Sequence, residues 1–227
     1  MESTYDLYII KTKYMQFCNY AYLGIDKSTK GAFVVDPSWD LSQMLEILYK
    51  NDAELKKILL THSHFDHTNM VTKIVNNFNS DVYMSKNEVE YYDYKCANLK
   101  CVEDMEVISL GETKIKCLVT PGHTKGSTCY WTGNNLFTGD TIFIEGCGLC
   151  NETGGSAEDM YYSINRLSKI IPLNIHVYPG HSFGEPPGKD IGSLKETNIY
   201  FQIYDIDKFV RFRNRENNSR TLNLKQV

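Results

Sequence analysis

The sequence predicts an α/β domain in which two sheets pack face to face and helices cover their outer sides. Segments rich in β-branched and aromatic residues alternate with helical patterns in the order strands, helices, strands, helix, strand, helix. No internal repeat, low-complexity tract or linker divides the 227 residues. A chain of this length can bury a sizeable core, so we expect one main domain.

The first half of the chain is expected to begin with strands and to continue with alternating helices and strands. Five runs are short, β-branched or aromatic, or apolar, and are bounded by turn residues: 7–11, 19–25, 32–35, 58–60 and 82–84. Three segments show helical spacing of apolar residues or are rich in tyrosine: 41–49, 70–78 and 88–94.

The second half predicts consecutive strands followed by a helix, a strand and a helix. Turns at Gly111-Glu112 and Gly133-Asn134-Asn135 separate strands expected at 107–110, 115–119, 128–131 and 136–137. Residues 157–170 place Met160, Ile164 and Leu167 at helical spacing and predict an amphipathic helix. A last strand at 175–178 and a helix at 193–203 complete the pattern.

Composition excludes several classes of protein. The net charge of −4 and a pI of about 5.9 argue against a general nucleic-acid binder. No apolar run approaches the roughly 20 residues that a membrane-spanning helix needs. The acidic, polar N-terminus lacks the features of a signal peptide, so a cytoplasmic location is expected.

The cysteines do not indicate a disulfide framework, because their number, seven, is odd and the chain is not small. Cys147 and Cys150 form a CxxC motif in a glycine-rich segment. A redox pair or half of a structural zinc site are alternatives, but no second CxxC completes a four-cysteine site. Ordinary reduced thiols are the expected state.

Residues from 208 onward change in character, because basic side chains outnumber acidic ones there. We therefore divide the chain into a domain over residues 1–207 and a basic C-terminal tail over residues 208–227. Such a tail is expected to be solvated, or to carry a functional role through Arg211, Arg213, Arg215, Arg220 and Lys225.

The run THSHFDH at residues 61–67 points most directly to chemistry. It follows the apolar segment 58–60 and holds His62, His64, Asp66 and His67 within six residues. Imidazole and carboxylate groups suit borderline divalent cations. A packed core would have to give each of these polar rings a partner. The run therefore predicts a metal site rather than a polar surface loop.

Three further turns each place one ligand-type residue beside glycine, directly after an apolar strand. They are PGHTKGS with His123, FTGDT with Asp140 and YPGH with His181. Glycine permits tight turns and close approach of the backbone, which loops converging on one point require. Each motif alone is weak, but together and in this order they indicate a single site.

These four motifs resemble the signature motifs of the metallo-β-lactamase superfamily. The resemblance implies an αβ/βα sandwich of two mixed sheets with outer helices and a metal site at one edge. It implies two divalent metal ions, zinc first with iron or manganese as alternatives. The implied ligands are His62, His64 and His123 for the first ion, Asp66, His67 and His181 for the second, and Asp140 bridging both. His176 remains as a structural histidine.

The resemblance also implies hydrolysis rather than redox chemistry. Oxygen-reducing di-iron relatives usually carry glutamate at the position of His64, and common secreted zinc β-lactamases carry cysteine at the position of Asp140. Hydrolytic enzymes of the glyoxalase II type, which act on thioesters, match at both positions. Ser127 stands where glyoxalase II usually has histidine.

Segments 143–150, 157–160, 181–184 and 198–202 resemble a narrower group, the metal-dependent hydrolases encoded with trans-acyltransferase polyketide synthases of the bacillaene type. The implied activity is removal of acyl groups from acyl carrier proteins, with Asp66 and Asp140 as catalytic ligands that position the attacking water. A small thioester such as hydroxyacylglutathione is the alternative substrate. A phosphodiesterase or a single-iron persulfide dioxygenase are alternative activities. The basic tail would meet an acidic carrier protein.

Overall fold

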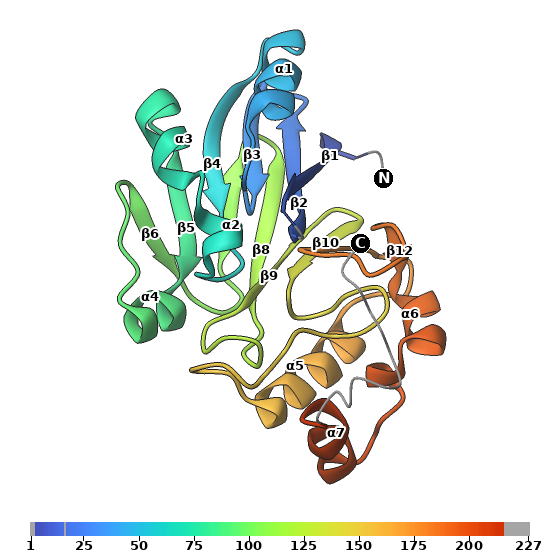
Figure 1. Ribbon diagram of the computed structural model, residues 1–227. Helices are drawn as coiled ribbons and strands as arrows, with labels where there is room; N and C mark the ends of the chain where they lie inside the picture. Colours follow the sequence, from blue (N-terminus) through green and yellow to red (C-terminus); the bar gives the residue numbers. More distant parts are fainter. Residues whose placement is uncertain (1–2, 16, 216–227) are drawn as a thin grey trace.

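The computed structural model describes residues 3–15 and 17–215, and within these residues it contains two six-stranded sheets (Figure 1). The first sheet follows the chain order: β1 (Tyr5–Tyr14), β2 (Phe17–Asp26), β3 (Gly31–Val35), β4 (Glu54–Leu59), β5 (Asp81–Ser85) and β6 (Leu99–Val102). The second sheet runs from β12 back to β7: β12 (Lys189–Asp190), β11 (His176–Pro179), β10 (Asn135–Gly139), β9 (Thr128–Thr132), β8 (Thr113–Val119) and β7 (Val107–Leu110). Both sheets are mixed, because β3 to β6 are parallel in one and β10 and β11 are parallel in the other.

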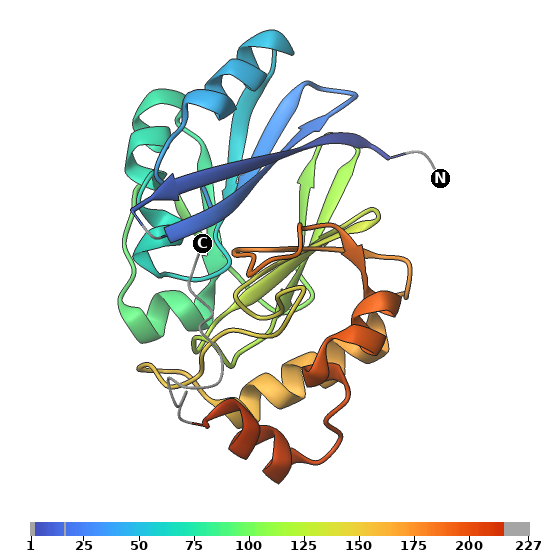
Figure 2. The same ribbon diagram turned by 45° about the vertical axis from the view of Figure 1, so that its right-hand side comes forward.

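Helices cover the outer side of each sheet (Figure 2). Those in the first half of the chain are α1 (Ser42–Lys50), α2 (Phe65–Thr68), α3 (Val71–Phe78) and α4 (Lys86–Tyr92). Those in the second half are α5 (Ala157–Ile170), α6 (Ile191–Thr197), the 3-10 turn η1 (Ile199–Phe201) and α7 (Ile206–Arg213). The two packed mixed sheets with outer helices are the architecture that the sequence predicts.

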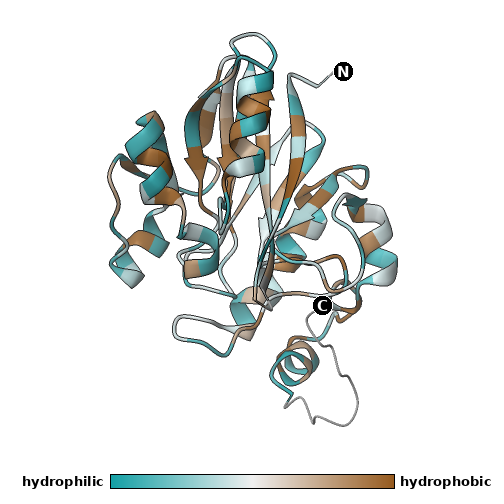
Figure 3. Cartoon of the chain, turned by 45° about the horizontal axis from the view of Figure 1, so that its top comes forward, coloured by the Kyte–Doolittle hydropathy of each residue, from teal (hydrophilic) through white to brown (hydrophobic). Residues whose placement is uncertain are grey.

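The apolar core is divided into three layers by the two sheets. Between the sheets lies an aromatic cluster in which Tyr22, Phe33, Tyr130 and Phe137 are fully buried. A second cluster packs α1 and α3 on the first sheet, and a third packs α5, α6 and α7 on the second. Hydrophobic residues are frequent in the strands, and the outer helices carry both hydrophobic and hydrophilic residues (Figure 3).

Most expected elements occur, and the differences have identifiable causes. The helix expected at 193–203 is two elements, because Asn198 interrupts it. The Asn198 amide nitrogen donates to the carbonyl oxygens of Phe143 (3.0 Å) and Gly146 (2.9 Å), and its side-chain oxygen accepts from Tyr200 N (3.0 Å). A buried asparagine therefore ends α6 and caps η1. The short elements β6, β12, α2 and α7 were not predicted from the sequence.

The boundary expected at residue 208 falls inside α7. The side chain of Phe209 is fully buried against the rings of Tyr161 and Tyr200, at centroid distances of 5.4 and 5.3 Å. Arg213 is half-buried and donates a hydrogen bond to the Tyr200 hydroxyl at 3.2 Å. The start of the basic segment is therefore packed on α5, while Arg220 and Lys225 lie outside the described residues.

Two further expectations concern membrane helices and cysteines. In the described part of the chain, no helix is long and apolar enough to cross a membrane. Cys147 and Cys150 are both free and buried. Burial raises the pKa of the Cys150 thiol to about 11 and that of Cys147 still further, so both thiols are unreactive at neutral pH.

Candidate metal centre

The predicted site residues lie at one edge of the sandwich, on loops that follow the ends of β4, β8, β10 and β11 and on the short helix α2. Backbone hydrogen bonds between the two sheets hold these loops together. Thr128 N donates to Thr61 O at 2.8 Å, and Tyr20 N donates to Gly180 O at 2.9 Å. The loops therefore converge because strands from both sheets are joined at this edge.

Three histidines direct ring nitrogens toward one point. His64 Nδ1 lies 3.0 Å from His62 Nε2 and 3.0 Å from His123 Nε2. His62 and His123 are buried, and His64 is partly exposed. This first cluster contains the three residues that the sequence assigns to the first metal ion.

A second cluster consists of Asp66, His67 and His181. His181 Nε2 lies 3.2 Å from Asp66 Oδ2 and 3.3 Å from His67 Nε2. The distance from His67 Nε2 to Asp66 Oδ2 is 3.6 Å. The imidazole nitrogens and the carboxylate oxygen thus face a second common point.

Asp140 lies between the two clusters and contacts both. Its Oδ2 is 3.7 Å from His123 Nε2 in the first cluster and 3.6 Å from His181 Nε2 in the second. Its Oδ1 is 3.5 Å from His67 Nε2. Oδ1 is buried and has no hydrogen-bond partner among the described residues. A buried carboxylate oxygen without a donor is costly unless a cation or another group satisfies it.

The outer nitrogens of four rings are held by neighbouring groups, which fixes how the inner nitrogens point. His123 Nδ1 lies 2.7 Å from Leu149 O, and His181 Nδ1 lies 2.9 Å from Cys18 O. A carbonyl oxygen only accepts, so in both rings Nδ1 carries a hydrogen, and when the ring is neutral Nε2 presents its lone pair to the centre. Lone pairs converging beside an unpartnered carboxylate oxygen are the donor set that a metal ion requires, so these residues fit metal binding.

The pKa values of the site residues, considered without a metal ion, shift in different directions in the two clusters. Burial, reinforced by the neighbouring histidines, lowers the pKa of His62 well below its ordinary value. Burial also lowers the pKa of His67 and His181, but the facing carboxylates outweigh it and raise the pKa of His181 to about 9. The surrounding imidazoles hold the pKa of Asp140 below its ordinary value despite burial. His62 is therefore neutral, while Asp66 and Asp140 are ionised.

Asp36, which the sequence analysis did not identify, supports both clusters. Its Oδ2 lies 3.0 Å from His67 Nδ1 and accepts from Thr61 Oγ1 at 2.6 Å, while Oδ1 accepts from Thr61 N at 2.8 Å. The Thr61 hydroxyl lies 3.0 Å from His62 Nδ1. The signal that could have found Asp36 is its position directly after the apolar strand β3, as for the predicted ligands.

Glu88 ties together the two loops of the first cluster and was also missed. Its side chain is fully buried. Oε1 accepts from Ser63 N (2.8 Å) and Ser63 Oγ (2.7 Å), and Oε2 accepts from Thr124 Oγ1 and Gly126 N (both 2.8 Å). Nothing in the sequence marks Glu88, because α4 carries other acidic and tyrosine residues around it.

Gly180 and Gly139 allow the loops after β10 and β11 to pack closely against Thr61, His67 and Asp140. A Cβ at Gly180 would lie 2.6 Å from both Asp140 Oδ1 and the His67 ring. Gly139 adopts a positive φ of 48°, and a Cβ there would lie 2.3 Å from the Thr61 hydroxyl oxygen. The glycines of the FTGDT and YPGH motifs are therefore needed for space as well as for conformation.

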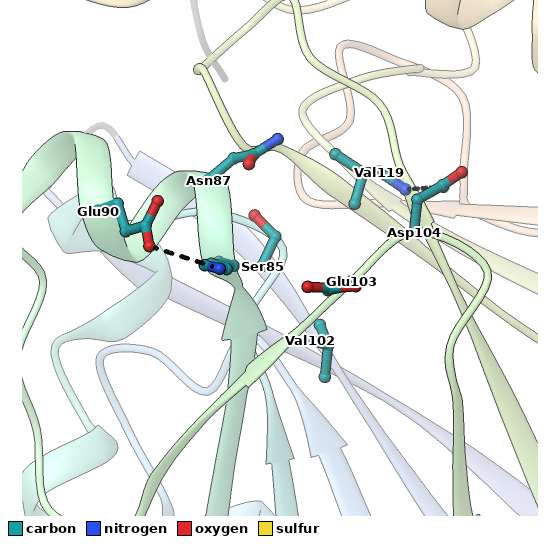
Figure 4. A pocket seen from close by; sticks show the side chains of 8 residues that line it. Ser85, Asn87, Glu90, Val102, Glu103, Asp104 and Val119 are labelled. Carbon is teal, nitrogen blue, oxygen red and sulfur yellow. Dashed lines mark hydrogen bonds and ion pairs between the residues drawn. The ribbon is translucent and has the colours of Figure 1, made fainter.

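A separate hollow of about 350 Å³ lies where α4 meets β6 and the end of β8 (Figure 4). It is lined by Ser85, Lys86, Asn87, Glu90, Val102, Glu103, Asp104 and Val119. Asp104 accepts from Val119 N at 2.9 Å and binds Arg166, so this carboxylate is already satisfied. The hollow contains none of the predicted metal ligands.

The chain is similar to known proteins over most of its length. Residues 16–181 match the metallo-beta-lactamase superfamily. The chain is 48% identical over 217 residues to the Bacillus subtilis protein named "Probable polyketide biosynthesis zinc-dependent hydrolase PksB", covering 96% of each chain. It is 33% identical over 200 residues to the Schizosaccharomyces pombe "Probable hydroxyacylglutathione hydrolase glo2", covering 84% of this chain and 74% of that protein.

The fold is shared with solved structures. A metallo-beta-lactamase crystal structure from Staphylococcus aureus superimposes with a TM-score of 0.84 at 24% identity, covering 94% of this chain and 68% of that one. At this identity the likeness concerns the fold alone. It matches the two packed sheets with outer helices described above.

Proposed function

Because the chain belongs to the metallo-beta-lactamase superfamily, we propose that it is a metal-dependent thioester hydrolase that removes acyl groups from an acyl carrier protein in polyketide biosynthesis. The observation that carries the proposal is the position of Asp140, whose carboxylate lies within 3.7 Å of ring nitrogens from both clusters. A carboxylate shared in this way suits a pair of divalent cations.

The proposed ligands divide as the clusters do. His62, His64 and His123 would hold one divalent ion, Asp66, His67 and His181 would hold the other, and Asp140 would contact both. Such an ion pair, when bound, supplies a water with a pKa near neutrality and positive charge for the oxygen of an attacked carbonyl. Zinc is the proposed metal, since the Bacillus subtilis relative is named as zinc-dependent.

The residues of the chain have separate tasks in the reaction. The oxygens of Asp66 and Asp140 would orient the attacking water by accepting its hydrogen. The leaving group of a thioester is a thiol with a pKa of about 8.5, so it departs as thiolate without a strong general acid. The carboxyl groups near the clusters are consistent with a reaction that needs no strong general acid. Asp66 and Asp140 face ring nitrogens. Glu152, on the outer side of His64, is largely exposed.

The choice of substrate rests on the relatives. The name of the relative with 48% identity places it in polyketide biosynthesis. Growing polyketides are carried as phosphopantetheine thioesters on carrier proteins. The second candidate function, hydrolysis of hydroxyacylglutathione, is favoured by the 33% identity to the yeast protein named for that activity. Both substrates are thioesters, so the bond that is broken is the same.

One experiment tests both the thioester hydrolysis and the preference for an acyl carrier protein. Purified protein of known metal content is assayed against an acyl carrier protein, an acyl-pantetheine, an acyl-glutathione and a phosphodiester. We expect hydrolysis of thioesters with the highest kcat/KM for the carrier. Preference for acyl-glutathione would favour the second candidate. Turnover of the phosphodiester alone, or one iron per chain with oxygen consumption, would overturn the proposal.

A substitution links the activity to the centre. Asp140→Ala removes the carboxylate that contacts both clusters, so we expect loss of most hydrolysis and a lower metal content per chain. Asp159→Ala is the matched control, because this carboxylate lies on the surface of α5 and pairs with Lys125 at 3.6 Å. Near wild-type turnover of Asp140→Ala with its metal intact would contradict the proposed role.

A further inference from the structure

Three aromatic side chains gather beside the second cluster, and we call them the aromatic shelf: Tyr14, Trp39 and Phe65. Tyr14 stacks on Trp39 with ring centroids 4.7 Å apart and an interplanar angle of 9°. The Phe65 ring meets the same indole edge-on at 6.0 Å. Phe65 is 72% exposed and Tyr14 is 50% exposed. The shelf therefore presents apolar ring surface to solvent, which is costly unless something binds there.

The backbone of Trp39 is strained, and two hydrogen bonds hold the residue in place. Its φ of 61° lies in the left-handed region, which bulky residues rarely adopt. Trp39 N donates to Asn69 Oδ1 at 2.8 Å, and the indole Nε1 donates to Asn19 Oδ1 at 2.7 Å. Strain of this kind persists when the surroundings over-determine the conformation and is concentrated at functional sites.

The shelf is attached directly to the second cluster. Phe65 stands between His64 and Asp66 in the sequence, at the start of α2. Asn19, which is buried, donates from Nδ2 to both the backbone oxygen of Asp66 (2.9 Å) and its Oδ2 (3.0 Å). The same amide thus holds the indole through its oxygen and the Asp66 carboxylate through its nitrogen. Shelf and cluster are fixed relative to each other.

The flank beside His181 has a different chemistry. The rings of Phe143 and Phe183 contact each other there, with centroids 5.0 Å apart. The Glu145 carboxylate lies beside them. Glu145 Oε1 accepts from Glu185 N at 2.6 Å and from Phe183 N at 3.3 Å. A carboxylate and peptide groups suit the amide-bearing arm of a thioester substrate, whereas the shelf consists of rings. Of these two surfaces, the shelf therefore suits an apolar acyl chain better.

We propose that the aromatic shelf binds the apolar acyl chain of the substrate and makes the enzyme selective for longer acyl groups. This rests on the proposed thioester hydrolysis, because a carbonyl that reaches the two clusters brings its acyl chain next to the shelf, which Asn19 fixes to Asp66. Burial of each methylene group is worth about fourfold in binding. Even partial contact along an eight-carbon chain should then change selectivity by tenfold or more.

Kinetics with two chain lengths test the shelf. The ratio of kcat/KM for octanoyl-pantetheine to that for acetyl-pantetheine is measured for the wild type, for Phe65→Ala and for Trp39→Ala. We expect the ratio to fall at least tenfold in both variants. Tyr49→Ala removes an 88% exposed ring at the end of α1 and should keep the wild-type ratio. A wild-type ratio in Phe65→Ala and Trp39→Ala would overturn the proposal.

A binding measurement tests the shelf independently of thioester hydrolysis. Trp131→Phe leaves Trp39 as the only tryptophan of the chain, so its fluorescence reports on the shelf. The thioether S-octyl-pantetheine cannot be hydrolysed, and we expect it to change this fluorescence at concentrations where S-ethyl-pantetheine does not. If the octyl ligand titrates Trp39 but no thioester is hydrolysed, the shelf stands and the proposed function fails. If thioesters are hydrolysed but the octyl ligand gives the same response as the ethyl ligand, the shelf fails alone.

Discussion

Oδ2 of Asp36 lies 3.0 Å from Nδ1 of His67, and both side chains are buried beside the candidate metal ligands. This contact sets the tautomer of His67, because a carboxylate only accepts and the ring must then present Nε2 to the second cluster. The same carboxylate accepts two hydrogen bonds from Thr61, next to His62. One residue outside the ligand set thus orients rings of both clusters.

We predict that Asp36→Ala lowers metal affinity about 10–100-fold, as is usual when a group that orients a ligand is removed. The buried donors of Thr61 and His67 would also lose their acceptor. Competition with a chelator measures the affinity. The control is Asp40→Ala, because Asp40 is exposed and its carboxylate accepts from Ser42 at the start of α1. Unchanged affinity in a folded Asp36→Ala protein would contradict this role.

Glu88→Gln tests the connection between the two loops of the first cluster. An amide nitrogen cannot accept, so two of the four hydrogen bonds from Ser63, Thr124 and Gly126 are lost. We expect the free energy of unfolding to fall by about 2–4 kcal/mol, measured by urea denaturation. Glu90→Gln on the same helix alters only an exposed pair with Lys86 and should cost less than about 0.5 kcal/mol. Equal effects of the two substitutions would refute the prediction.

The ligand candidates could be predicted because they share one local pattern. His62, His123, Asp140 and His181 each follow an apolar strand closely, and three of them adjoin a glycine that permits the close approach. Because strand ends of packed sheets meet at an edge, the pattern alone predicts that these side chains lie close together. The seven residues do lie together in two clusters joined by Asp140.

The supporting residues could not be predicted, because their roles depend on contacts between segments far apart in the chain. Asn19 reaches Asp66 across 47 positions, and Glu88 reaches Thr124 across 36. Single Asn and Glu residues in a strand and a helix carry no periodic signal. The packing of Phe209 was missed although Ile206, Phe209 and Val210 stand at helical spacing, because the basic residues around them indicated a solvated tail.

Removal of metal should destabilise the protein. Without a cation, Asp140 Oδ1 stays buried without a donor. A ligand present at 100 times its dissociation constant stabilises by about 2.7 kcal/mol, which corresponds to roughly 5–10 °C for a domain of this size. We therefore expect the melting temperature to fall by about that amount after treatment with a chelator and to return with zinc. In Asp140→Ala the response to zinc should shrink, whereas His176→Asn, outside both clusters, should keep it. A wild-type protein that melts at one temperature with and without zinc would argue against the centre.

Asp26 joins the two sheets away from the candidate metal ligands. Its buried carboxylate accepts hydrogen bonds from the backbone and hydroxyl groups of Ser28 and Thr29 and of Thr113, at the start of β8. Burial alone would raise the pKa of Asp26, but the hydrogen bonds from Ser28, Thr113 and Thr29 outweigh it and lower the pKa well below its ordinary value.

The depressed pKa of Asp26 predicts the direction of a pH effect. Its contribution is complete above the unfolded pKa of about 3.9 and is lost as pH falls toward the lower folded pKa. Asp26→Asn should therefore lower the free energy of unfolding by about 1–3 kcal/mol at pH 7 and by less at pH 3, where the wild type has lost part of this stabilisation. Urea denaturation at both pH values measures the difference. Asp6→Asn, at an exposed pair with Lys27, should show little effect at pH 7. If the two proteins differ in free energy of unfolding by as much at pH 3 as at pH 7, the folded pKa of Asp26 is not lower than its unfolded pKa.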